Sequence, residues 1–80
     1  MLFRSMNENL RHILGTNVRR LRRAHGMSKV DFCMTAGISR PILDKMERGE
    51  ANAQLDTLCK VAAALGVEPS DLLRNRPPRR

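Results

Sequence analysis

The fold is decided by the stretch Gly37-Ile38-Ser39-Arg40-Pro41-Ile42-Leu43-Asp44-Lys45-Met46-Glu47-Arg48-Gly49, which carries helix signals at both ends. Ser39 is a predicted N-cap, since its hydroxyl can accept a hydrogen bond from a first-turn amide, and Pro41 fits the first turn, where a missing N–H costs nothing. Gly49 can adopt the left-handed conformation that ends a helix. A helix this short is unstable alone in water, so its neighbours must hold it in place.

The helical spacing divides this stretch into two faces. Leu43 and Met46 are predicted to face inward, together with Ile38. The outward face then carries the side chains that can recognise a partner, namely Ser39, Arg40, Pro41, Ile42, Asp44, Lys45 and Arg48.

Apolar residues at spacings of three and four predict helices before and after this stretch. The first runs from about Asn7 to His25, with Leu10, Ile13, Leu14, Val18 and Leu21 facing inward. A short helix over about 29–35 follows the predicted N-cap Ser28. A fourth helix over about 54–65 has the predicted buried stripe Leu55, Leu58, Val61, Ala62 and Leu65, and a last turn of helix follows Pro69.

These signals predict one all-α domain. It covers residues 7–73, with a loose N-terminal arm at 1–6 and a disordered basic tail at 74–80. Eighty residues leave room for a small core, and an enclosed catalytic cleft is not expected. We therefore expect a binding protein that is not an enzyme and needs no cofactor or small-molecule ligand.

The charge of the chain indicates the class of partner. A net charge of +7 in 80 residues favours a polyanion, most simply nucleic acid, although a basic chain can also bind a membrane surface. The two phenylalanines are the only aromatic residues, which counts against binding of single strands or RNA by base stacking. No apolar run approaches twenty residues and no signal-peptide pattern is present, so we expect a cytoplasmic, nucleoid-associated protein with no membrane segment.

The cysteines and histidines suggest a rival class, a small hydrolase or metal enzyme. Cys33 and Cys59 stand alone in the sequence, and neither His12 nor His25 has a carboxylate at ligand spacing. Structural roles are the simpler interpretation for all of them. No metal site is predicted.

Two short helices joined by about three residues with a glycine form a helix-turn-helix arrangement. Here the joint is Gly37-Ile38-Ser39. In this arrangement the second helix enters the major groove of double-stranded DNA and the first lies across the backbone. Many helical hairpins share the spacing, so it needs further support.

Several motifs give that support because they agree in order and spacing. They are Leu14-Gly15-x-x-Val18-Arg19-x-Leu21-Arg22, Met27-Ser28-Lys29, Ala36-Gly37-Ile38-Ser39, Met46-Glu47-Arg48-Gly49 and Leu55-x-x-Leu58-x-x-Val61-Ala62-x-x-Leu65-Gly66-Val67. From about Leu14 to Leu73 the chain resembles the lambda-repressor-like (Cro and XRE type) DNA-binding domain. The resemblance implies five helices, a two-fold dimer on operator DNA and control of transcription, with repression favoured.

The resemblance also implies roles for individual residues. Arg40, Pro41 and Lys45 match positions that reach base edges, and Ile42 either packs on a thymine methyl or supports the neighbouring turn. The predicted phosphate contacts are Ser28, Lys29, Ser39, Arg48, Asn52 and Arg19. Arg22 and Glu47 match an internal ion pair between the first and third helices.

Protein partners are predicted on two other surfaces. Val67, Leu72 and Leu73 at the end of the domain are the expected homodimer interface. Val30 and Met34, one helical turn apart, are apolar where the family usually has charged residues, and they mark a possible protein-binding site. Two alternatives therefore stay open: a DNA-binding antitoxin subunit, and a controller protein of a restriction-modification system.

Overall fold

The computed structural model describes residues 2–75, and in this part of the chain the secondary structure is entirely helical. Its elements are α1 (Leu2–Ala24), α2 (Lys29–Ala36), α3 (Arg40–Glu47), α4 (Leu55–Leu65) and the 3₁₀ helix η1 (Pro69–Leu73). The all-α class is confirmed, but the expected fifth helix is a single 3₁₀ turn. A segment of five residues is typical of a 3₁₀ helix, and η1 begins with a capping box between Glu68 and Asp71.

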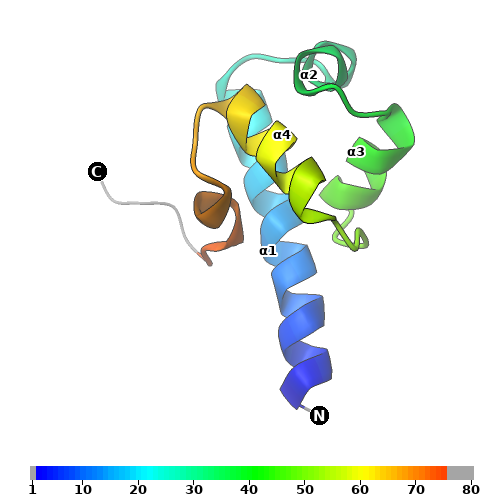
Figure 1. Ribbon diagram of the computed structural model, residues 1–80, viewed down its shortest axis with the longest axis vertical. Coiled ribbons are helices and arrows are strands. Elements are labelled where there is room, and N and C mark those ends of the chain that lie inside the picture. Colours follow the sequence, from blue (N-terminus) through cyan, green and yellow to red (C-terminus); the bar gives the residue numbers. More distant parts are fainter. Residues whose placement is uncertain (1, 76–80) are drawn as a thin grey trace.

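Helix α1 is longer than predicted. It starts at Leu2, so the prediction of a loose arm at 1–6 is wrong for residues 2–6. Met6 and Leu10 continue the spacing of four residues, and no glycine or proline interrupts the chain there. In Figure 1 this N-terminal half of α1 extends beyond the other elements. The extension explains why Leu10, predicted to be buried, is exposed.

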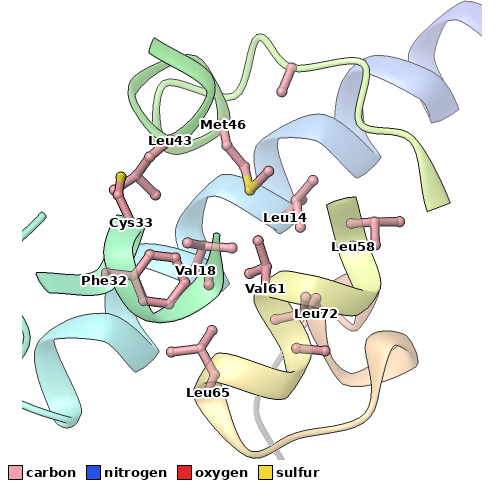
Figure 2. Close-up of a cluster of buried hydrophobic side chains, with 13 residues drawn as sticks. Leu14, Val18, Phe32, Cys33, Leu43, Met46, Leu58, Val61, Leu65 and Leu72 are labelled. Carbon is pink, nitrogen blue, oxygen red and sulfur yellow. The ribbon is translucent and has the colours of Figure 1, made fainter. Parts of the chain in front are cut away.

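The core lies where α1, α2, α3 and α4 meet. Figure 2 shows the ring of Phe32 beside Val18 within this core, and both are completely buried. Leu43 and Met46 enter from α3, as predicted, and they too are completely buried. Leu55 is a correction: its side chain is 79% exposed, because it is the first residue of α4 and lies beyond the edge of the core.

Hydrogen bonds from Asn17, a residue to which the sequence analysis assigned no role, join η1 to α1. Asn17 is buried, and its Nδ2 donates to the carbonyl oxygens of Leu72 at 2.8 Å and Arg74 at 2.9 Å. These bonds hold Arg74, the first residue of the predicted tail 74–80, against α1. The rest of that tail, from residue 76 onward, lies outside the described residues.

Leu72 does not belong to a dimer surface. Its side chain is 0% exposed and completes the core between α1 and α4, so its prediction as an interface residue is wrong. Two leucines in succession on a short turn face different sides, and only Leu73, at 36% exposure, faces solvent. Val67 is half-buried against the core.

Helices α1 and α3 approach each other closely at Gly15. A Cβ atom there would collide with the backbone carbonyl of Met46, so only glycine fits. The contact brings the end of α3 against the middle of α1. Glu47 is thereby placed beside the arginines of α1.

Candidate nucleic-acid interface

Local hydrogen bonds fix the turn between α2 and α3. Gly37 has a left-handed φ of 75°, and its N–H donates to the carbonyl of Cys33 at 2.8 Å. Ser28 and Ser39 are both N-caps, as predicted, accepting from Asp31 N at 3.0 Å and Ile42 N at 3.4 Å. Each hydroxyl accepts one bond as a cap and keeps its own proton to donate, so the cap role is compatible with a phosphate contact.

The outward face of α3 is open to solvent. Leu43, Met46 and Glu47 are buried beneath it, and Asp44 lies half-buried at its side. The exposed residues are Ser39, Arg40, Pro41, Ile42, Lys45 and Arg48. All of the residues predicted to read bases therefore lie on one accessible surface.

A basic groove of about 390 Å³ runs along one side of this surface, between α1, α2 and α3. Its lining residues are Arg19, Arg22, Arg23, Lys29, Arg40, Asp44, Glu47 and Arg48. The structure thus brings four predicted contact residues (Arg19, Lys29, Arg40 and Arg48) into one groove. The positive charge of this groove is suited to a phosphate backbone.

Asp44 links two of these cations. Its Oδ1 lies 3.3 Å from Lys29 Nζ, which donates a hydrogen bond, and 3.7 Å from Arg40 Nε. The hydrogen bond from Lys29 holds the pKa of Asp44 below its usual value. Sequence reasoning placed Asp44 on the outward face but missed this pairing, although its i, i+4 spacing from Arg40 was a usable signal.

The ion pair predicted between Arg22 and Glu47 is present in the structure. Arg22 Nε donates to Glu47 Oε2 at 2.7 Å and Nη2 donates to Oε1 at 3.1 Å, while Nη1 donates to the carbonyl of Met27 at 3.0 Å. The hydrogen bond to Glu47 raises the pKa of Arg22 further above its already high value. Arg19 Nη2 also donates to the Glu47 carbonyl, at 3.0 Å. This network fixes the end of α3 to α1.

A second groove, of about 330 Å³, lies on the other side of α3. Ile42, Lys45 and Asn52 line it, together with Met46, Ala51, Ala53, Gln54 and Thr57. Gln54 caps α4 without a side-chain hydrogen bond, so the first-turn amides of α4 have no capping partner there. Asn52 is exposed beside them, which is consistent with its predicted phosphate contact.

The remaining predicted residues lie elsewhere. Val30 and Met34 are exposed on α2. Val67 is half-buried just after α4, and Leu73 lines a shallow pocket with Leu10, Asn52 and Ala53. Cys33 is buried, and burial raises the pKa of its thiol, whereas Cys59 is exposed. His25 Nε2 hydrogen-bonds with the carbonyl of Leu65 at 3.0 Å.

Two searches of the described residues bear on other classes of protein. Within residues 2–75, no three side chains of His, Cys, Asp or Glu gather where they could hold a metal ion. No helix among them has the length and apolar character needed to cross a membrane.

Comparison with known proteins identifies relatives of this arrangement. The chain is 36% identical over 69 residues to the control protein C.BamHI of Bacillus amyloliquefaciens, a match that covers 85% of each chain. It is 35% identical over 60 residues to the HTH-type transcriptional regulator SutR of Escherichia coli, covering 75% of this chain and 34% of that protein.

Solved structures agree with these relatives. The restriction-modification controller protein C.AhdI of Aeromonas hydrophila superposes with a TM-score of 0.73 at 34% identity, covering 78% of this chain and 94% of that one. The hypothetical transcription factor NHTF from Neisseria superposes with a TM-score of 0.78 at 35% identity, covering 90% and 80%. The family profile described as helix-turn-helix matches residues 18–72, from the last third of α1 to η1. The chain therefore belongs to the helix-turn-helix family of the Cro and XRE type.

Proposed function

We propose that this protein is a transcriptional regulator that binds a palindromic operator in double-stranded DNA as a homodimer, and that it acts by repression. The observation that carries the proposal is the open face of α3. Arg40 and Lys45 are exposed on it, with the basic groove on one side and Asn52 on the other. A helix placed in the major groove meets phosphates on both sides, and this surface has donors on both sides.

Position and sequence would be read by different side chains. Lys29, Arg48 and Arg19 lie along the basic groove and would contact phosphates, which fix the orientation of the domain. Arg40 and Lys45 would contact base edges, and Arg is suited to the O6 and N7 acceptors of guanine. Ile42 lines the second groove and is also exposed, so it can reach a thymine methyl.

Selection of bound duplexes from a random pool tests the proposal. We expect one enriched motif with two-fold symmetry and half-sites centred about 34–36 Å apart, because each domain of a dimer reads one major groove. Sedimentation of the protein with the enriched duplex should give two chains per duplex. A pool without enrichment would contradict DNA recognition, and an enriched single half-site bound by one chain would contradict the dimer.

A role as a controller protein is the second candidate. Two relatives favour it, since C.BamHI and C.AhdI are named as such and each matches most of its length. This role uses the same DNA surface, so the expected binding results are the same. Activity on the promoter of a neighbouring restriction-modification operon would separate it from other regulators.

An antitoxin role instead needs a bound protein, for which Val30 and Met34 offer an exposed apolar pair.

Arg40→Ala is expected to reduce discrimination between bases at one position of each half-site by about 1–3 kcal/mol, since it removes a bidentate donor to guanine. The measurement is competition binding with single-base variants of the selected duplex. Arg74→Ala is the matched control, because Arg74 is also an exposed arginine in an ion pair but follows η1 and lines neither of the two grooves beside α3. An unchanged base profile for Arg40→Ala would contradict its reading role.

Lys29→Ala is expected to weaken binding to all sequences alike. The logarithm of the binding constant should also fall less steeply with the logarithm of the salt concentration, by about one unit of slope, because one phosphate contact is lost. The measurement is a salt titration with selected and random duplexes. Lys60→Ala serves as the control, since Lys60 is similarly exposed and also pairs with an aspartate, but on α4. Equal slopes for Lys29→Ala and the parent protein would place Lys29 outside the phosphate contacts.

A further inference from the structure

One acidic side chain lies within the surface that faces DNA in the proposed complex. Helix α3 contains two carboxylates, and Glu47 is buried by its pair with Arg22. Asp44 instead lines the basic groove with 33% of its side chain exposed. A negative charge here repels phosphates, so simple affinity for DNA does not explain its presence.

The contacts of Asp44 suggest what it does. Through Oδ1 it holds Lys29 at Nζ and Arg40 at Nε, and each of these cations remains more than a third exposed. Because the Nε of Arg40 faces Asp44 at 3.7 Å, its two Nη groups are left to donate to the O6 and N7 of a base. The carboxylate therefore favours orientations of the guanidinium in which Nε faces Asp44.

We propose that Asp44 is a positioning residue that increases sequence selectivity, by orienting Arg40 toward a base edge and by competing with phosphates for Arg40. This inference rests on the proposed function of α3 as the reading helix. On a wrong sequence, Arg40 can bind only phosphates, and it must give up Asp44 to do so. On the correct sequence, Arg40 binds its base while Nε keeps its contact with Asp44.

Asp44→Asn tests the inference, because it removes the charge and keeps the shape. Without the carboxylate, Lys29 and Arg40 are free to bind phosphates, so affinity for a random-sequence duplex should rise. Because both ion pairs are exposed and individually weak, the expected rise is about threefold to tenfold. Affinity for the duplex selected from the random pool should rise less, since the orientation of Arg40 is lost there. The ratio of selected to random affinity should therefore fall about threefold or more at fixed salt, as measured by fluorescence anisotropy.

Three variants separate this role from charge and from folding. Glu8→Gln removes the same charge from the exposed N-terminal half of α1 and should leave the ratio unchanged. Asp44→Glu keeps the carboxylate and should restore most of the ratio. Asp44→Ser is a second neutral variant, and thermal unfolding of each variant shows that the fold is retained.

Combining Asp44→Asn with Arg40→Ala tests directly whether Asp44 acts through Arg40. In Arg40→Ala protein, Asp44→Asn should lower the ratio no further, because the residue that it orients is absent. If the parent protein selects a motif and Asp44→Asn keeps the parent ratio, the inference is overturned and the proposed function stands. If the parent protein enriches no sequence at all, the proposed function fails and the inference fails with it.

Discussion

Glu47→Ala is expected to lower the free energy of unfolding by about 3–5 kcal/mol, because it leaves a buried guanidinium without its partner. The side chains of Arg22 and Glu47 are 9% and 4% exposed, so little water is within reach to replace the lost hydrogen bonds. Arg22 Nη1 would keep its bond to the Met27 carbonyl, which does not neutralise the charge. The end of α3 would also lose its link to α1, so DNA binding should weaken together with stability.

Urea denaturation followed by circular dichroism measures this loss. Glu50→Ala is the matched control: the pair of Arg48 and Glu50 is 3.2 Å long, but both side chains are 57% exposed. Such a surface pair is worth about 0–1 kcal/mol. A Glu47→Ala protein as stable as Glu50→Ala would contradict the assignment of a buried pair. The double variant Arg22→Met, Glu47→Leu should recover much of the loss, because neither charge is then buried alone.

The part of the fold that the sequence predicted best is the part set by local chemistry. Ser28 and Ser39 cap α2 and α3, and Gly37 takes the left-handed conformation between them. Each of these signals acts within about four residues, so it can be recognised without knowing the packing. The outward face of α3 followed from the same helical spacing.

Other features depend on distant parts of the chain and could not be predicted in this way. Leu55 has the spacing of a core residue, yet as the first residue of α4 it lies outside the core and is exposed. Asn17 reads as an ordinary polar residue on α1, and only the return of η1 gives its amide the carbonyls of Leu72 and Arg74. Asp44 meets Lys29 because the turn brings α2 beside α3. In each case tertiary contact decides the role.

Leu72→Ala is expected to lower the free energy of unfolding by about 2–5 kcal/mol, the usual range for removing a buried leucine side chain. Leu72 is 0% exposed and belongs to the cluster shown in Figure 2. The loss would fall at the junction of α1, α4 and η1, because Asn17 bonds the carbonyl of this same residue. Urea denaturation at several protein concentrations measures the effect.

Leu73→Ala is the matched control, since it deletes the same atoms from the next residue, which is 36% exposed. Its effect on the stability of a single chain should stay below about 1 kcal/mol, because surface substitutions are usually small. In the proposed dimer, Leu73 remains an interface residue, so Leu73→Ala should instead raise the dissociation constant measured by sedimentation. If Leu72→Ala weakened only the dimer and left the unfolding of dilute protein unchanged, Leu72 would be an interface residue, and its place in the core would be wrong.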